Sequence, residues 1–453
     1  MRTRTVRSFR DITHREVDWR RPVVTLFSGG LDSSYLLHRL VEAGATDVHA
    51  VSVDVGGDES PPELRRITDS LGVRLHVLDE RAVFAGEFVT PAIAAHALYL
   101  GSYPISSSLS RPLFARAALR TAEELGAEVI LHTANRSQNT LRRLNGALRQ
   151  LGFRGRFGSP YELEPVHREK KIKELRAIGL EEMAERSASA DSNLWCREFE
   201  SGILDDPEDH RVPESCFRWS ARPRTPGAET VEVSFEAGVP VAVDGRRMSP
   251  VELIGALNPI VGAHGLGRHT GLEHLPGGAK VLEVREAPAA WLLMASHRHL
   301  ETATLDAETL REKLHLEQVW VREAVEGRWF GELRAACQAF TAELAGPVTG
   351  TVRWRLAGGR TSTESIVAEN PRYVRSREDW ELAGVRDELG YFEPDPEARN
   401  GNENRNGNGN GDASGTRNGN RNGTPAGHRT AAGTTAGTTG GPGTAQEIGG
   451  ATW

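Results

Sequence analysis

The chain has 453 residues, of which 38% are hydrophobic, and it carries a net charge of −7. This length allows two domains of ordinary size, and the negative charge argues against a general nucleic-acid binder. Its three cysteines, Cys196, Cys216 and Cys337, form no CxxC pair, so we expect neither a disulfide framework nor a zinc site. Because no apolar run is as long as a membrane span, we expect no membrane partner and a cytoplasmic location.

The first 21 residues are rich in arginine. They contain no apolar core of the kind that directs secretion, and Asp11, Glu16 and Asp18 argue against a transit peptide. We therefore predict that residues 1–21 form a basic, solvated arm.

Short apolar runs alternate with helical patterns between residues 22 and 135. Strand patterns occur at 22–27, 47–55, 73–79 and 128–133, and helix patterns occur at 33–45, 61–72 and 111–127. This alternation predicts a parallel sheet covered by helices on both faces, with ligands bound beyond the carboxyl ends of its strands. We assign this α/β domain to residues 22–185.

The order of the elements changes after about residue 190. Residues 230–245 and 348–370 read as hairpins, and residues 249–265 and 306–327 read as helices. We therefore predict a second, α+β domain over residues 186–395. Residues 396–453 are rich in Gly, Asn and Thr and contain few large apolar side chains, so we predict a disordered tail there.

The stretch "SGGLDSS" at residues 28–34 lies where a predicted strand turns into a predicted helix. Gly29 and Gly30 would let an anion approach the backbone amides of the helix N-terminus, and the serines would add hydroxyl donors. Asp32 cannot donate to a phosphate, so it is better suited to hold Mg²⁺ or to shape the loop. The stretch contains no lysine and matches neither GxxxxGK[ST] nor GxGxxG, which excludes a Walker A loop and a dinucleotide fingerprint. We interpret it as a phosphate site.

This loop resembles the pyrophosphate-binding loop of the N-type ATP pyrophosphatases, which cleave ATP between the α- and β-phosphates. Four further stretches resemble motifs of the argininosuccinate synthase family. They are "PAIAAHALYLGSYPISSSLSRPLFAR" (91–116), "SNLWCREFESGILDDP" (192–207), "VEVSFEAGVPVAVDGRRMSPVELIGALNPIVGAHGLGR" (231–268) and "PVTGTVRWRLAGG" (347–359). The motifs are collinear over about residues 22–380, so the chain is identified as a divergent member of that family.

The resemblance implies an adenine nucleotide alpha-hydrolase-like first domain and an α+β synthetase domain. It also implies a reaction, in which ATP adenylates the ureido oxygen of citrulline with release of pyrophosphate, and the amine of aspartate then displaces AMP. Such chemistry depends on positioning and charge neutralisation, not on a protein nucleophile. The implied cofactors are ATP and Mg²⁺, the partners are small-molecule substrates, and the assembly is a homotetramer.

The family motifs assign roles to individual residues of this chain. Nucleotide contacts fall on Phe27, Ser28, Gly29, Gly30, Leu31, Asp32, Ser33, Ser34, Val53 and His132. Substrate contacts fall on Tyr103, Ser108, Asn135, Asn139, Thr140, Arg143, Ser189, Glu198, Glu273 and Arg285. Ser28, Asp32 and Asn139 are the predicted catalytic residues, and Asp32 is the predicted Mg²⁺ ligand.

Both substrate pockets depart from the family pattern, whereas the ATP loop does not. In "TANRSQNTLRR", a threonine that contacts aspartate is replaced by Asn135, and an aspartate that pairs with the substrate amine is replaced by Thr140. Losing such a charged hydrogen bond typically costs about 1.5–3 kcal/mol. A family arginine is Ser102 here, a citrulline-contacting serine is Glu198, and a tyrosine is Arg285. Glu198 and Arg285 either recognise a new polar substrate or pair with each other.

Three functions follow from these departures. The first is an AMP-forming ligase that joins altered substrates in specialised biosynthesis. The second is ordinary argininosuccinate synthesis with compensating substitutions, and the third is a nucleotide-binding pseudoenzyme whose tail meets a partner. A tRNA thiolase ranks last, because it would need a cysteine pair and a basic surface.

Overall fold

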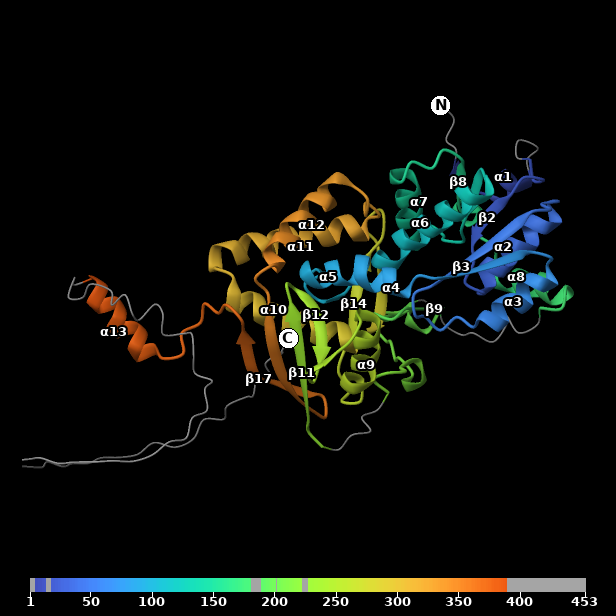
Figure 1. Ribbon diagram of the computed structural model, residues 1–453. Coiled ribbons are helices and arrows are strands. Elements are labelled where there is room, and N and C mark those ends of the chain that lie inside the picture. Colours follow the sequence, from blue (N-terminus) through green and yellow to red (C-terminus); the bar gives the residue numbers. More distant parts are fainter. Residues whose placement is uncertain (1–4, 14–17, 181–188, 201, 222–226, 389–453) are drawn as a thin grey trace, which may run out of the picture. The chain divides into compact units, whose positions relative to one another are not determined.

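The computed structural model describes residues 5–13, 18–180, 189–200, 202–221 and 227–388 (Figure 1). Residues 1–375 form one compact unit, and a second unit begins at Ser376 and contains helix α13, Arg377–Glu388. The predicted disordered tail over 396–453 lies outside the described residues. Among the described helices, none has the length and apolar character needed to cross a membrane.

A six-stranded parallel sheet forms the core of the first half of the compact unit. Its strand order is β1-β8-β7-β2-β3-β4, and each neighbouring pair is parallel. The strands are β1 Thr5–Val6, β2 Val23–Leu26, β3 Val48–Asp54, β4 Arg74–Asp79, β7 Val129–Leu131 and β8 Arg156–Gly158. The parallel sheet predicted from residues 22–133 is therefore confirmed.

Helices cover both faces of this sheet, as predicted (Figure 1). They are α2 Leu31–Glu42, α3 Pro61–Ser70, α6 Ser107–Leu125, α7 Thr140–Gln150 and α8 Arg168–Ala177. Successive strand residues point to opposite faces, so Val23 packs in one core cluster with α2, α3 and α8, and Val24 packs in another with α6 and α7. The carboxyl ends of β2, β3 and β7 therefore lie at the same edge of the sheet. The helices on the two faces beside this edge pack in two separate hydrophobic cores.

The prediction of a solvated N-terminal arm is wrong for the described residues of that segment. Thr5 and Val6 pair with β8 as the edge strand of the sheet, and helix α1, Phe9–Thr13, follows. Phe9 is buried and meets the ring of Tyr161 edge-on, with 5.0 Å between ring centroids. The segment was predicted wrongly because its few apolar residues, set among arginines, show no helical or strand period. The partner of Phe9, Tyr161, also lies about 150 residues further along the chain.

The second half of the compact unit contains two antiparallel sheets and four long helices. One sheet has the order β14-β15-β10-β9, and the other has the order β13-β12-β11-β16-β17. The strands are β9 Ser189–Ser192, β10 Arg197–Glu200, β11 Glu229–Glu236, β12 Val239–Val243, β13 Arg246–Arg247, β14 Arg268–His274, β15 Lys280–Glu286, β16 Gly350–Ala357 and β17 Arg360–Ala368. The predicted hairpins are confirmed as β11–β12 and β16–β17.

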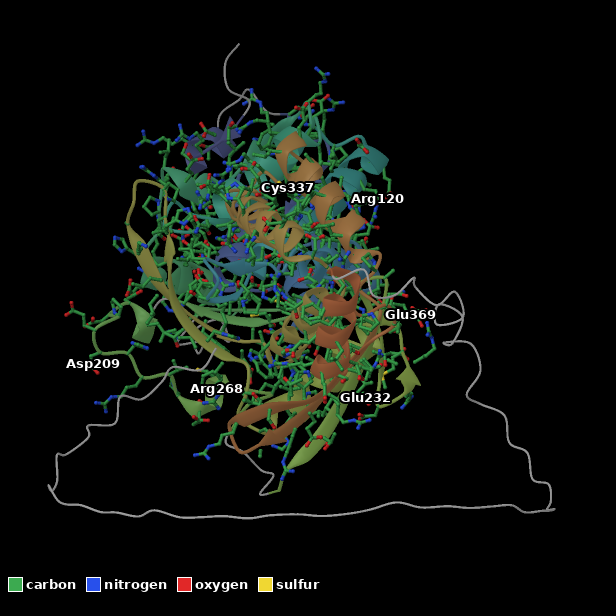
Figure 2. All side chains as sticks on the ribbon, turned by 90° about the vertical axis from the view of Figure 1, so that its left-hand side faces the viewer. Arg120, Asp209, Glu232, Arg268, Cys337 and Glu369 are labelled. Atoms are coloured by element: carbon green, nitrogen blue, oxygen red, sulfur yellow. The ribbon has the colours of Figure 1, made fainter. Side chains whose placement is uncertain are left out.

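The helices of this half are α9 Pro250–Gly262, α10 Pro288–Thr304, α11 Ala307–Val325 and α12 Glu332–Ala345. Ser249 caps α9: its Oγ accepts from the amide of Glu252 at 3.3 Å, and the Glu252 carboxylate accepts from the amide of Ser249 at 2.9 Å. Cys337 of α12 is a buried free thiol (Figure 2).

Short elements between β4 and α6 pack against helices of both halves. They are α4 Arg81–Val83, a π-helix at Phe84–Val89, α5 Thr90–Ala94 and the hairpin of β5 Leu98–Tyr99 with β6 Tyr103–Pro104. One core cluster runs through both halves, because it includes Leu144 and Leu148 of α7 together with Val321 and Val325 of α11. The substrate-pocket residues on α7 are therefore held by packing from the second half.

The packing of α7 against the segment after α11 is tight enough to test. A methyl group at Gly146 would overlap the backbone carbonyl oxygen of Gly327. We expect Gly146→Ala to lower the free energy of unfolding by about 1–3 kcal/mol, as overpacking does, when urea unfolding is followed by circular dichroism. Gly255→Ala in α9 is the control, because its methyl group meets no atom within 4 Å. Equal stability of the two variants would contradict this packing.

Candidate active site

The loop at residues 27–30 joins β2 to α2, and its conformation lets an anion come close to its backbone. The amide of Phe27 donates to the carbonyl of Val51 at 2.9 Å, which keeps the loop on the sheet. Gly29 has φ of +69°, and a Cβ there would lie 2.5 Å from a methyl carbon of Leu64. Gly30 is the N-cap residue, and no side chain caps α2. The first amides of α2 therefore face a position that an anion can occupy.

Two serines of the predicted nucleotide set border this loop. The hydroxyls of Ser28 and Ser33 lie 3.4 Å apart, and the Ser33 hydroxyl donates to the carbonyl of Gly30 at 3.1 Å. Ser34 is buried in the first turn of α2, which begins at Leu31. These groups all lie at the N-terminal end of α2, where the sequence placed them.

Asp32 has a cationic partner that the sequence did not reveal. The ammonium of Lys171, on α8, forms an ion pair with Asp32, and the hydroxyl of Tyr161 donates to the Asp32 carbonyl at 2.9 Å. Lys171 also lies 5.6 Å from the centroid of the Tyr161 ring. Because Lys171 is 139 residues further along the chain, no local motif pointed to it. The loop lacks a lysine of its own, and α8 brings one to it.

The residues around Asp32 fit a magnesium ion that arrives with a nucleotide. Among the described residues, no group of three or more His, Cys, Asp or Glu side chains is placed to hold a metal ion. Mg²⁺ is commonly held by one or two carboxylates together with substrate phosphates, and the partly exposed Asp32 can supply one carboxylate.

Val53 and His132 lie near the carboxyl ends of strands that flank β2. Val53 is buried in β3, and His132 directly follows β7. The Nε2 of His132 lies 3.0 Å from Oδ1 of Asn145, and burial lowers the pKa of the His132 imidazole to about 4. His132 is therefore neutral near pH 7 and acts as a hydrogen-bonding group.

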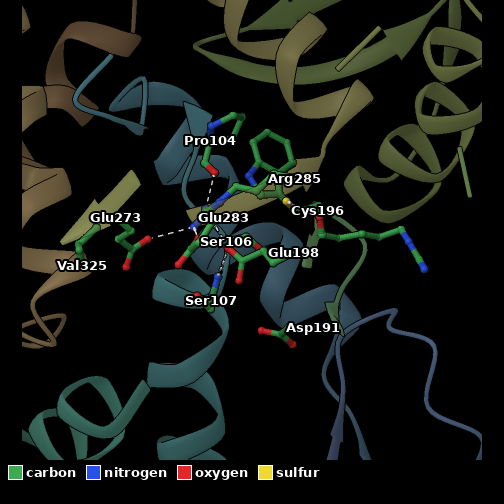
Figure 3. Close-up of polar contacts among 12 residues, drawn as sticks. Pro104, Ser106, Ser107, Asp191, Cys196, Glu198, Glu273, Glu283, Arg285 and Val325 are labelled. Atoms are coloured by element: carbon green, nitrogen blue, oxygen red, sulfur yellow. Dashed lines mark hydrogen bonds and ion pairs between the residues drawn. The ribbon is translucent and has the colours of Figure 1, made fainter. Parts of the chain in front are cut away.

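A second group of predicted residues surrounds the buried guanidinium of Arg285 (Figure 3). Its Nη1 lies 2.8 Å from the Glu198 carboxylate and donates to the carbonyl of Pro104 at 2.9 Å. Its Nη2 pairs with Glu273 at 3.0 Å and with Glu283. Glu198 and Arg285 are direct cross-strand partners on β10 and β15. Of the two alternatives left open by the sequence, the structure shows that they pair with each other.

Arg143 and Asn139 join this group from α7 and the residue before it. The Nη2 of Arg143 pairs with Glu273, its Nη1 donates to the Ser107 hydroxyl at 2.9 Å, and its Nε donates to the carbonyl of Val325 at 3.0 Å. The Nδ2 of Asn139 donates to the Glu273 carboxylate at 2.6 Å. Glu273 is thus the shared acceptor of both arginines and the asparagine.

The charges in this group do not balance. Glu198, Glu273 and Glu283 face the guanidinium groups of Arg143 and Arg285. Burial raises the pKa of Glu273, but both arginines outweigh it and hold that pKa below the ordinary value. Burial also raises the pKa of Glu283, and Glu273 and Glu198 raise it further, although Arg285 opposes them. Glu283, which the sequence did not single out, is therefore the carboxyl that keeps a proton.

Tyr103 and Ser108 complete the group on the side of β6 and α6. The ring of Tyr103 lies 4.4 Å from the Arg285 guanidinium carbon and stacks on Tyr99 with 5.3 Å between centroids. Ser108 is buried in the first turn of α6. Within the described residues, the hydroxyl of Tyr103 and the Oδ1 of Asn139 are buried and have no hydrogen-bond partner. These two atoms therefore have unused hydrogen-bonding capacity inside the group.

The remaining predicted residues lie at the edge of the group. Asn135 is engaged in its own turn, because its Oδ1 accepts from the amide of Ser137 at 3.1 Å and from the Ser137 hydroxyl at 2.6 Å. Thr140 is the first residue of α7. Ser189 begins β9, but its side chain lies outside the described residues.

A pocket of about 350 Å³ lies beside the outer face of α7, next to this edge. It is lined mainly by polar and charged residues, among them Arg136, Arg142, Arg149, Glu326 and Arg328. Asn145, which holds His132, also lines it. The pocket therefore borders the altered "TANRSQNTLRR" segment, and one of its lining residues contacts the residue that follows β7.

The fold and the two groups of residues define a nucleotide-binding α/β domain joined to an α+β domain, with a buried group of charged side chains where the substrate contacts were predicted. Residues 22–173 match the family model described as "Arginosuccinate synthase N-terminal HUP domain", and residues 188–377 match "Arginosuccinate synthase C-terminal domain". The chain belongs to the argininosuccinate synthase family.

Individual relatives agree with this assignment. The chain is 35% identical over 373 residues to the argininosuccinate synthase of Rubrobacter xylanophilus, covering 81% of this chain and 91% of that protein. It is 37% identical over 346 residues to that of Symbiobacterium thermophilum, covering 75% and 86%. It is 34% identical over 377 residues to that of Thermosynechococcus vestitus, covering 82% and 92%.

The surplus proton on Glu283 has a measurable consequence. Since its pKa is higher in the folded than in the unfolded chain, Glu283 binds more proton in the folded state, and its contribution to stability falls as pH rises from about 5 to 8. The free energy of unfolding is measured by urea unfolding at pH 5 and pH 8. We expect Glu283→Gln to reduce its decrease between these pH values by roughly 1–2 kcal/mol.

Glu252→Gln is the matched control for this measurement. Hydrogen bonds from Ser249 lower the pKa of Glu252, so Glu252 titrates below the tested pH range. The substitution should therefore leave the decrease in the free energy of unfolding between pH 5 and pH 8 unchanged. If the free energy of unfolding of Glu283→Gln decreases between pH 5 and pH 8 as much as that of the wild type, the pKa of Glu283 is not raised in the folded protein.

Proposed function

We propose that the chain is an ATP-dependent carbon–nitrogen ligase that forms AMP and pyrophosphate, as the family resemblance implies. The single observation that carries this is the uncapped N-terminus of α2 behind Gly29 and Gly30, with Asp32 and Lys171 beside it. Amides, a helix dipole and an ammonium together suit the leaving pyrophosphate.

In the first step, a carbonyl or ureido oxygen of one substrate attacks the α-phosphorus of ATP. The bond from that phosphorus to the oxygen bridging to the β-phosphate breaks, and pyrophosphate leaves with the bonding electron pair. The loop amides and the Ser28 and Ser33 hydroxyls stabilise the negative charge that develops on the leaving group. Asp32 would hold Mg²⁺, which would neutralise part of the phosphate charge.

In the second step, an amine attacks the activated carbon, AMP leaves, and the amine nitrogen loses a proton. The protein contributes orientation and charge, with the Asn139 amide and the Tyr103 hydroxyl as the orienting groups for the activated substrate. The arginines around the pocket beside α7 favour an anionic amine, such as aspartate or another amino acid.

Argininosuccinate synthesis itself is the second candidate function. It is favoured by the relatives above and by the presence of Tyr103, Asn139, Arg143 and Glu273 in one group. The altered-substrate function is favoured by the buried pair of Glu198 and Arg285, which stand where the family has a serine and a tyrosine. A homotetramer and a cytoplasmic location stay predictions from the sequence.

Pyrophosphate release from ATP and Mg²⁺ distinguishes these functions. It is measured with citrulline plus aspartate, and then with a panel of ureido and carbonyl compounds plus amines. We expect release with a member of the panel at a higher rate than with citrulline plus aspartate. Equal or faster release with citrulline and aspartate would establish argininosuccinate synthesis, and release with no compound would contradict a ligase.

Asp32 provides a direct test of the loop. We expect Asp32→Asn to lower pyrophosphate release by about 10–1,000-fold, because an electrostatic contact in the transition state is lost. Asp69→Asn, on the exposed side of α3, is the control and should retain activity. Full activity of Asp32→Asn would contradict the assignment of the loop.

A further inference from the structure

The N-terminus of α6 is occupied by a carboxylate of the protein itself. The N-cap residue Ser106 forms no side-chain cap, and the first helical amide, that of Ser107, donates instead to the Glu198 carboxylate at 3.3 Å. The dipole of this 19-residue helix favours a negative charge at that position. Glu198 therefore stands where a substrate carboxylate would gain most from α6.

Arg143, which the resemblance places on an arginine that contacts the citrulline carboxylate, is also occupied. Each of its three guanidinium nitrogens has a protein partner, and one of these partners is the carboxylate of Glu273. Both candidate carboxylate positions thus contain a glutamate, and Arg285 holds both glutamates in place. A substrate carboxylate would have to displace one of these buried ion pairs.

Two atoms without partners belong to uncharged side chains and suit an uncharged ligand group, and a third, the Nε of Arg285, belongs to the guanidinium that already faces three carboxylates. The Tyr103 hydroxyl can donate, since burial raises its pKa, and the Asn139 Oδ1 can accept. A ureido or amide group offers the matching carbonyl oxygen and N–H donors.

We propose that the substrate activated by ATP is a ureido or amide compound without an α-carboxylate, with Glu198 standing in for the missing carboxylate. This inference rests on the proposed ligase function and specifies its substrate class. The carbonyl oxygen of that compound forms the new bond to the α-phosphorus, and pyrophosphate leaves as described above. Glu198 and Arg285 are the residues that determine specificity.

The test uses three ureido compounds that differ in their charged groups. Citrulline has a carboxylate and an ammonium, (4-aminobutyl)urea has the ammonium alone, and butylurea has neither. With the full-length protein, ATP, Mg²⁺ and aspartate, we expect kcat/KM for pyrophosphate release to be at least roughly 10-fold higher with one of the carboxylate-free compounds than with citrulline. A preference for citrulline would overturn the proposal and leave the ligase function standing.

Variants test the two residues directly. Glu198→Ser combined with Arg285→Tyr should shift the preference toward citrulline by about 10–100-fold, and Glu198→Gln alone should shift it in the same direction. Glu236→Ser combined with Arg247→Tyr makes the same changes at an exposed ion pair, and should leave the preference unchanged. If both Glu198 variants keep the wild-type preference for a carboxylate-free compound over citrulline, the proposal is overturned. If a variant fails to fold, the comparison of the three compounds with the wild-type protein still tests the proposal.

ATP binding, measured by calorimetry on the same samples, distinguishes the two possible failures. Intact binding with pyrophosphate release that favours citrulline refutes the substrate class alone. Intact binding without release from any ureido or amide compound refutes the ligase function, and the substrate class with it.

Discussion

The buried guanidinium of Arg285 is the constraint on which the second half of the site depends. A charge removed from water is costly unless carboxylates surround it, and here they come from β10, β14 and β15. The same guanidinium holds the Pro104 carbonyl of β6 and lies on the Tyr103 ring. A single side chain therefore links three strands that also pair in one sheet with a hairpin outside it, and a slip in their register would leave a buried charge unpaired.

The nucleotide loop follows a different physical logic. Its conformation depends on Gly29 and on an uncapped helix end, which are local, and on a hydrogen bond from Phe27 to Val51 of the neighbouring strand. The residues predicted to recognise the substrate come from β6, α7, β10, β14 and β15 and meet only in the folded chain. A change of substrate can thus leave the phosphate chemistry intact, which agrees with a family-like loop beside altered pockets.

Local features were predictable from the sequence, and long-range pairings were not. The β2–loop–α2 unit and the capping box at Ser249 follow from neighbouring residues, and both are found. Lys171 was missed because nothing near it indicates contact with Asp32, and Glu283 was missed because a lone acidic residue in a strand usually faces water. The pairing of Glu198 with Arg285 could be named as one of two alternatives, but the choice required the strand register.

The order in which Glu198 and Arg285 arose is also constrained by their burial. If Glu198 replaced a serine first, a third carboxylate would enter a buried site that already contains Glu273 and Glu283, without a new cation. If Arg285 replaced a tyrosine first, the carboxylate of Glu273 would already be within reach of its guanidinium. The arginine is thus the step that an ancestral protein could tolerate first, and its arrival would have made the glutamate acceptable. On this path, the arginine enters the buried site first and the glutamate completes the ion pair.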